Sequence, residues 1–177
     1  MLYYIHGYLS SPTGSKASIF KKELGAIPVN YRFVPAEELV IDDCLSEIKK
    51  VIDTDDAVTL IGSSLGGCLA GKLARDLPDQ INHLILLNPA VIPPDIDLNL
   101  IRDMPLRILK DMKDDRLFSK KLDVRITIFS ATNDTVVPPR WVIQFAQFQE
   151  ATVQFLHDDH RFSRNLSRLP ELIKLFM

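Results

Sequence analysis

Residues 57–66 read Ala-Val-Thr-Leu-Ile-Gly-Ser-Ser-Leu-Gly, an almost continuous apolar run that ends in a turn of glycine and serine. A run of this kind is typical of a central strand that helices cover on both faces. After the turn, apolar residues recur at helical spacing from Leu69 to Leu77. This stretch therefore predicts a strand, a sharp turn and a helix in direct succession.

The turn carries the pattern Gly-x-Ser-x-Gly, with Ser64 at its centre. Between a strand and a helix, this pattern is typical of a nucleophile elbow. Gly62 and Gly66 are needed there because the turn brings strand and helix so close that a side chain at either position would clash. Ser64 would project at the carboxyl edge of the sheet, where the first N–H groups of the helix favour developing negative charge. A glycine and serine turn without chemistry is the alternative.

Short runs rich in β-branched and aromatic residues alternate with longer helical patterns along the rest of the chain. One such helical pattern, from Val40 to Asp53, has a single apolar stripe. The alternation predicts a doubly wound α/β fold with a six-stranded, mainly parallel sheet and helical crossovers. The expected strands are Leu2–Ile5, Val29–Phe33, Ala57–Ile61, Leu84–Leu87, Arg125–Ser130 and Val153–Leu156.

A serine hydroxyl is a weak nucleophile near neutral pH, so it requires a base and a group that holds that base. Asp134 follows the fifth expected strand and precedes a helix that begins with proline, which makes it the candidate for that group. A turn-forming aspartate is the alternative. His160, between the last strand and the final helix, is the candidate base, and His157 at the end of that strand is the alternative. We expect Asp158 and Asp159 to be solvated loop charges.

The loop after the first strand, residues 6–12, reads His-Gly-Tyr-Leu-Ser-Ser-Pro. Next to a nucleophile elbow, a loop in this position supplies the second backbone N–H of the oxyanion hole, and the residue after the nucleophile supplies the first. We expect the backbone N–H groups of Tyr8 and Leu65 to hold the oxygen of a tetrahedral intermediate. We expect His6 to orient the backbone of this loop and not to exchange protons.

Four segments in this order resemble the small bacterial esterases called YqiA-like, within the α/β-hydrolase superfamily. They are the opening residues 6–12, the elbow at 62–67, the Asn-Asp-Thr-Val-Val-Pro segment at 133–138 and the late His160. The resemblance runs nearly end to end. It implies the α/β-hydrolase fold with strand order 2-1-3-4-5-6, and esterase activity on short acyl esters, with thioesters also possible.

Carried over by residue, the resemblance implies that Ser64 is the nucleophile, Asp134 the acid and His160 the base. The amides of Tyr8 and Leu65 would form the oxyanion hole. The reaction would pass through an acyl-enzyme and would need no cofactor or metal. The alternative is a binding or scaffold protein that has the same fold and no catalytic activity.

Residues 92–123 interrupt the alternation with prolines, a helical pattern and a charged patch, and we expect an insertion over the site. Its apolar residues Leu98, Ile101 and Ile108 would either accept an acyl chain or pack on the sheet edge. Exposed apolar surface there would also suit a homodimer contact. No repeat or long linker divides the chain, so we expect one domain over residues 1–177.

The composition, with 46% hydrophobic and 25% charged residues and a formal net charge of −2, is ordinary for a globular enzyme. Lysine and arginine are scattered, which argues against nucleic acid as a partner. No apolar run approaches the ~18 residues of a membrane span. Without a signal-peptide pattern, and with Cys44 and Cys68 in apolar helical patterns, we expect a cytoplasmic protein with buried, reduced thiols. The expected partner is a small ester or thioester substrate.

Residues 66–72 match Gly-x-x-x-x-Gly-Lys, the pattern of a phosphate-binding loop. However, Leu73 stands where such a loop needs the hydroxyl of serine or threonine for Mg²⁺. The helical spacing that begins at Leu69 instead predicts that the stretch is coiled into a helix. We therefore predict no nucleotide binding.

Overall fold

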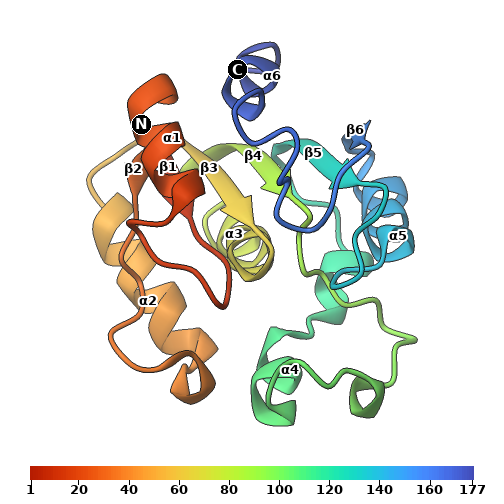
Figure 1. Ribbon diagram of the computed structural model, residues 1–177. Coiled ribbons are helices and arrows are strands. Elements are labelled where there is room, and N and C mark those ends of the chain that lie inside the picture. Colours follow the sequence, from red (N-terminus) through yellow and green to blue (C-terminus); the bar gives the residue numbers. More distant parts are fainter.

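Strands and helices alternate along the chain in the computed structural model, which covers residues 1–177 (Figure 1). The strands are β1 (Leu2–Ile5), β2 (Ile27–Pro28), β3 (Val58–Ser63), β4 (Ile81–Leu87), β5 (Arg125–Ala131) and β6 (Thr152–Leu156). The α-helices are α1 (Ser15–Leu24), α2 (Ile41–Ile52), α3 (Leu65–Asp76), α4 (Leu106–Met112), α5 (Pro139–Gln149) and α6 (Leu169–Lys174).

All six strands form one sheet in the order β2-β1-β3-β4-β5-β6, and every neighbouring pair is parallel. This confirms the expected doubly wound α/β fold and its strand order. In the register of the sheet, Ile5 of β1 lies opposite Gly62 of β3, and Ser63 lies opposite Leu87 of β4. Because the strands are parallel, the loops that follow β1, β3, β4, β5 and β6 all leave from the same edge (Figure 1).

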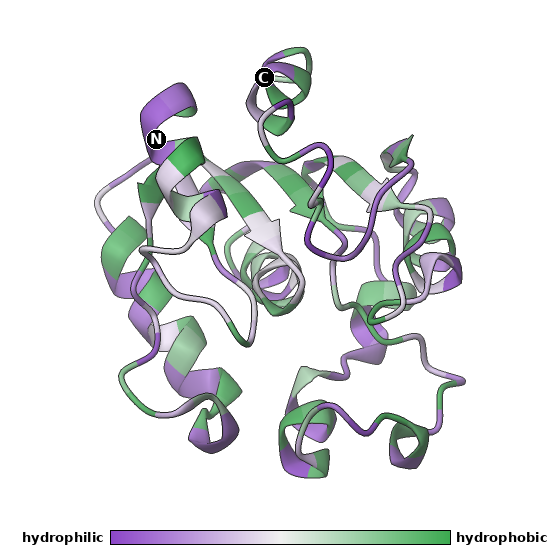
Figure 2. Ribbon diagram, viewed as in Figure 1, coloured by the Kyte–Doolittle hydropathy of each residue, from purple (hydrophilic) through white to green (hydrophobic).

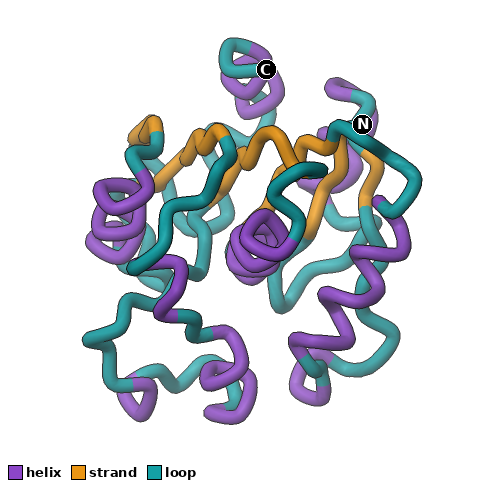
Figure 3. Tube along the Cα trace, turned by 180° about the vertical axis from the view of Figure 1, so that it is seen from behind, coloured by secondary structure: helices purple, strands orange, loops and turns teal.

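Helices cover both faces of the sheet. The larger core cluster, of 35 buried residues, lies on the face that α2, α3, α4 and α5 cover, and a smaller cluster of 12 lies under α1 and α6. Seen from behind in Figure 3, the strands form a layer between these two groups of helices. Figure 2 shows that hydrophobic residues concentrate on the strands, while the helices carry both hydrophobic and hydrophilic residues. This is the distribution that a sheet covered on both faces requires.

The second strand differs from the prediction, which placed it at Val29–Phe33. The structure forms only the two-residue strand β2 at Ile27–Pro28, and the Val29 N–H still donates to the Tyr4 carbonyl at 2.9 Å. The chain then leaves the sheet edge, because the Tyr31 side chain is buried against the loop after β1. In the predicted strand, β-strand propensity thus indicated the burial of Val29 and Tyr31 but not sheet pairing, and Phe33 is exposed.

Both cysteines are buried free thiols, as predicted. Burial raises the pKa of Cys44 and of Cys68 to about 11, so neither is poised as a thiolate. None of the helices combines the length and the apolar character that crossing a membrane requires.

Candidate active site

Ser64 lies in the turn between β3 and α3 in a strained backbone conformation, with φ 53° and ψ −117°. A positive φ is uncommon outside glycine and persists only where the surroundings enforce it. Here the Ser64 N–H donates to the Leu87 carbonyl at 2.9 Å, and the Ser64 carbonyl accepts from the N–H groups of Gly67 at 2.9 Å and Ala90 at 3.0 Å. These bonds hold the predicted elbow against the end of β4 and the residues that follow it.

The two elbow glycines are required by close packing. A Cβ on Gly62 would overlap the backbone of Gly66, and a Cβ on Gly66 would overlap the carbonyl oxygen of Ile5 at the end of β1. Helix α3 therefore begins in direct contact with the β1 backbone. This contact places Ser64 next to the loop that follows β1.

That loop passes directly beside the serine. A Cβ built on Gly7 would lie 3.3 Å from the Ser64 Cβ and 3.8 Å from its Oγ. Tyr8 is the next residue of this loop, and Leu65 follows Ser64 as the first residue of α3. Both therefore belong to segments that adjoin Ser64. This is the arrangement in which their N–H groups could receive an oxyanion.

Side chains that follow β2 hold the same loop in place. The Tyr31 hydroxyl donates to the His6 carbonyl at 2.8 Å, and the Arg32 guanidinium donates to the carbonyls of Tyr8 at 2.7 Å and Ser10 at 3.0 Å. The His6 ring is buried, stacks on Tyr31 and has its Nδ1 2.9 Å from the Gly7 carbonyl. Burial lowers the pKa of His6, which suits the structural position expected for it.

His160 and Asp134 are joined by a hydrogen bond of 2.7 Å between the Nδ1 of the ring and the Oδ2 of the carboxylate. Asp134 is buried, and its other oxygen, Oδ1, accepts from the N–H groups of Val136 and Val137, both at 2.8 Å. The aspartate therefore forms the turn that was the alternative interpretation, and it also contacts the candidate base. When Nδ1 carries the donated proton, Nε2 is left as a proton acceptor.

The alternative base does not reach Asp134. His157 is exposed, and its ring Nδ1 lies 3.5 Å from the Thr132 hydroxyl. Of the two histidines, the structure brings only His160 to the candidate acid.

Asp158 is not a solvated charge, and this prediction was wrong. It is 2% exposed and accepts from the N–H groups of Asp159, Arg164 and Asn165. Burial by itself would raise the pKa of Asp158, but these bonds and the Asn165 side chain hold it below its ordinary value. The carboxylate thus organises the loop that carries His160. Asp159 is exposed, as predicted.

Asn88, at the end of β4, was not singled out by the sequence analysis. It is buried, has a φ of 44°, and contacts both the His160 loop and the end of β5. The signal available in the sequence was the Asn-Pro pair directly after a buried apolar strand, which is a turn signal and does not indicate chemistry.

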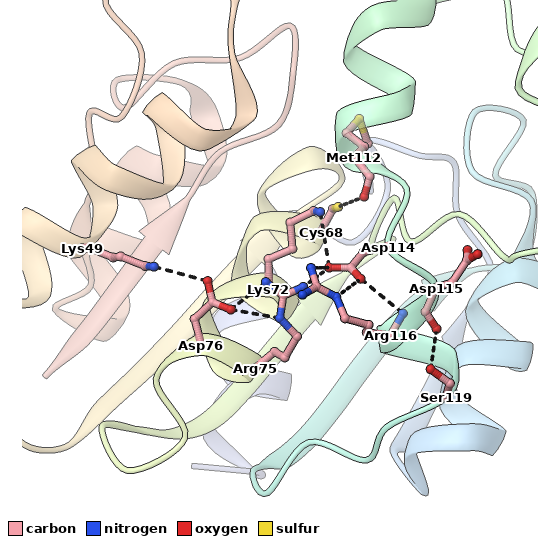
Figure 4. Close-up of polar contacts among 10 residues, drawn as sticks. All are labelled: Lys49, Cys68, Lys72, Arg75, Asp76, Met112, Asp114, Asp115, Arg116 and Ser119. Carbon is pink, nitrogen blue, oxygen red and sulfur yellow. Dashed lines mark hydrogen bonds and ion pairs between the residues drawn. The ribbon is translucent and has the colours of Figure 1, made fainter.

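The charged patch of the insertion, residues 110–116, is bound to α3 by ion pairs of Asp114, whose carboxylate is almost fully buried (Figure 4). Arg75 pairs with Asp114, the Lys72 Nζ lies 3.5 Å from the same carboxylate, and the Arg116 Nε lies 2.8 Å from it. Lys72 is thus an ion-pair residue within helix α3. This confirms the prediction that residues 66–72 are helical and do not form a phosphate-binding loop.

Apolar residues of the insertion pack on the body of the protein. Ile108 of α4 is fully buried in the larger core, Leu98 and Ile101 are partly buried against it, and the Cys68 thiol contacts the Met112 carbonyl at 3.5 Å. Packing therefore accounts for Ile108 fully and for Leu98 and Ile101 in part.

Replacing Asp114 by asparagine is expected to lower the free energy of unfolding by about 3 kcal/mol, because the buried Lys72 and the partly buried Arg75 lose their shared counter-charge. Urea unfolding followed by circular dichroism measures the change. The control is Asp115→Asn, the next residue, which is exposed. Equal stability of the two variants would mean that the network does not anchor the insertion.

Sequence comparison places the whole chain, residues 1–177, within the profile of the uncharacterised protein family UPF0227. No curated protein matches it in sequence. Among solved structures, Est1E of Butyrivibrio proteoclasticus with bound ferulic acid aligns with a TM-score of 0.81 at 19% identity, over 99% of this chain and 87% of that one.

Two further structures align over 99% of this chain. α/β-Hydrolase domain-containing protein 10 of mouse has a TM-score of 0.74 at 20% identity over 88% of its own chain. The monoacylglycerol lipase of Paleococcus ferrophilus has a TM-score of 0.76 at 14% identity over 92% of its own chain. At these identities the alignments show a shared fold, the α/β-hydrolase fold.

Proposed function

Since the chain belongs to the UPF0227 family of YqiA-like proteins and has the α/β-hydrolase fold, we propose that it is a serine hydrolase. Its substrates are short-chain carboxylic esters or thioesters, cleaved through an acyl-enzyme on Ser64. The observation that carries the proposal is the 2.7 Å hydrogen bond from His160 to the buried Asp134, at the same sheet edge as a serine held in an elbow. A buried carboxylate that accepts a hydrogen bond from Nδ1 leaves Nε2 available as a general base.

In the first half of the reaction, His160 Nε2 takes the Ser64 proton as Oγ attacks the carbonyl carbon of the substrate. The N–H groups of Tyr8 and Leu65 receive the negative oxygen of the tetrahedral intermediate. The bond from the carbonyl carbon to the alcohol oxygen or thiol sulfur then breaks, and the leaving group takes the proton from His160. Ser64 is left as an ester of the acyl group.

In the second half, His160 removes a proton from water, which attacks the acyl-enzyme carbonyl. Collapse of the second intermediate releases the carboxylic acid and returns the proton to Ser64 Oγ. Asp134 keeps the proton of the neutral imidazole on Nδ1 and stabilises the imidazolium in both halves. Because Asp134 also holds its own turn through Val136 and Val137, the base is oriented before substrate arrives.

Apolar side chains near the triad support a substrate with an apolar acyl group. Leu9, in the loop beside Ser64, is 80% exposed, and Val136, in the Asp134 turn, is 50% exposed. The neighbours named above include a lipase and a protein with a bound aromatic carboxylic acid, and carboxylic esters are the related substrate class. Ile108 is fully buried in the core and does not serve this role, while Leu98 and Ile101 are only partly buried.

The test is labelling of the purified protein by a fluorophosphonate probe, which reacts with activated serines, read by intact mass. The wild type is expected to take up one probe, and Ser64→Ala none. Ser167→Ala, which removes an exposed serine in the loop before α6, is the matched control and is expected to label like the wild type. A folded wild type that takes up no probe would refute the proposal and favour a scaffold or binding protein.

A further inference from the structure

Asn88 is a buried polar residue that the proposed mechanism does not use. It directly follows β4, is 1% exposed and has a φ of 44°. Asparagine is among the few residues that adopt this left-handed conformation at modest cost. A buried amide in a strained backbone requires specific partners, because an unsatisfied one would cost about 1–3 kcal/mol.

Both ends of the Asn88 amide are bonded, and they bond to different loops. The Oδ1 accepts from the Ala131 N–H at 2.7 Å, at the end of β5. The Nδ2 donates to the backbone carbonyl of His160 at 3.1 Å. The Asn88 N–H itself donates to the Phe129 carbonyl at 3.0 Å. The amide donates and accepts at once, which an ionised carboxylate or an aliphatic group of the same size cannot do.

The bonded positions belong to the candidate acid and base. The Ala131 carbonyl accepts from the Asp134 N–H at 3.3 Å, so Asn88 holds the residue on which the Asp134 turn begins. Its other bond holds the main chain of His160 itself. The His160 ring and the Asp134 carboxylate are joined by the Nδ1–Oδ2 bond of 2.7 Å. The Asn88 amide thus holds the backbone on both sides of this bond, at His160 and at the start of the Asp134 turn.

The residues on either side of Asn88 hold the candidate nucleophile. The Leu87 carbonyl accepts from the Ser64 N–H, and the Ala90 N–H donates to the Ser64 carbonyl. Residues 87–90 therefore contact all three of the loops that carry Ser64, Asp134 and His160. No other segment described above has bonds to all three.

We propose that Asn88 is a positioning residue, whose amide sets the His160 main chain against the Asp134 turn and so keeps the imidazole bonded to Asp134. This rests on the proposed function. Asn88 touches no reacting atom, so it acts through the placement of His160. A displacement of about 1 Å at a catalytic group can cost on the order of 10²-fold in rate.

Two variants separate the amide from the backbone. Asn88→Asp keeps the shape and the acceptor for Ala131 but replaces the donor opposite the His160 carbonyl with an oxygen. Asn88→Gly removes both bonds while relieving the positive φ. Asn82→Asp is the matched control, because it makes the same change at an exposed position of the same strand.

Each variant is measured for the rate of fluorophosphonate labelling, for kcat and KM on a short p-nitrophenyl ester as functions of pH, and for the low-field proton NMR signal of the His160 Nδ1–H. We expect both Asn88 variants to lose about ten- to a hundredfold in labelling rate and kcat, with KM little changed. We also expect the low-field signal to shift or broaden in their folded state, and the pH profile of kcat to differ from that of the wild type. Asn82→Asp is expected to match the wild type.

Folded Asn88 variants with the wild-type labelling rate, pH profile and low-field signal would overturn the inference. Activity lost only in proportion to unfolding, with an unchanged signal in the folded fraction, would also overturn it, because Asn88 would then be structural alone. If the wild type itself does not label, the proposed function fails separately. The low-field signal then decides whether Asn88 positions His160 against Asp134.

Discussion

Replacing Asp134 by asparagine is expected to lower kcat by about 10⁴-fold without unfolding the protein. The asparagine Oδ1 can still accept from the N–H groups of Val136 and Val137, so the turn survives. Its Nδ2, however, would face His160 Nδ1 where a carboxylate oxygen now accepts. Two donors cannot bond, so the ring takes the tautomer with the proton on Nε2, which cannot receive the Ser64 proton.

The measurement is kcat for a short p-nitrophenyl ester, with circular dichroism to establish that the variant is folded. Asp159→Asn is the matched control, because Asp159 lies in the His160 loop and is exposed, and its Oδ1 accepts N–H groups that an amide oxygen can also accept. It is expected to stay close to the wild-type rate. Equal activity of the two variants would mean that Asp134 serves only as a turn former.

The parts of the site that the sequence predicted are those in which a local pattern reflects a local constraint. The spacing of Gly62, Ser64 and Gly66 follows from the sharp turn between strand and helix. In the structure, Ser64 has a positive φ, and neither glycine has room for a Cβ. Asp134 precedes a helix that begins at Pro139, and this context was sufficient to select it. The fold was predictable for the same reason, since β3 and α3 each show their own periodicity.

The features of the structure that could not be predicted from the sequence depend on contacts between distant segments. Asp158 and Asp159 are both aspartates in a polar loop, yet only Asp158 turns inward, toward N–H groups up to seven residues further along the chain. Asn88 depends on β4, β5 and the His160 loop coming together, with its Nδ2 bond spanning 72 positions. The segment after Pro28 likewise follows the burial of Tyr31 and not its own β propensity.

Replacing Gly66 by alanine is expected to lower the free energy of unfolding by at least about 4 kcal/mol, because the new methyl group would overlap backbone atoms of Ile5 and His6. A side chain could rotate away, but these carbonyl groups belong to the end of β1 and to the loop beside Ser64. The start of α3 would have to move off β1 and take Ser64 with it. Loss of fluorophosphonate labelling should therefore accompany the loss of stability.

Gly71→Ala, five residues further along the same helix, is the matched control. The new methyl group would lie 3.6 Å from the nearest side-chain atom, which belongs to Leu117, so it would make an ordinary contact. Alanine is favoured over glycine within a helix by about 1 kcal/mol, and this variant should be as stable as the wild type or slightly more stable. Urea unfolding compares the two. A Gly66→Ala protein as stable as Gly71→Ala would mean that α3 does not begin against β1, and the placement of Ser64 derived from that contact would fail with it.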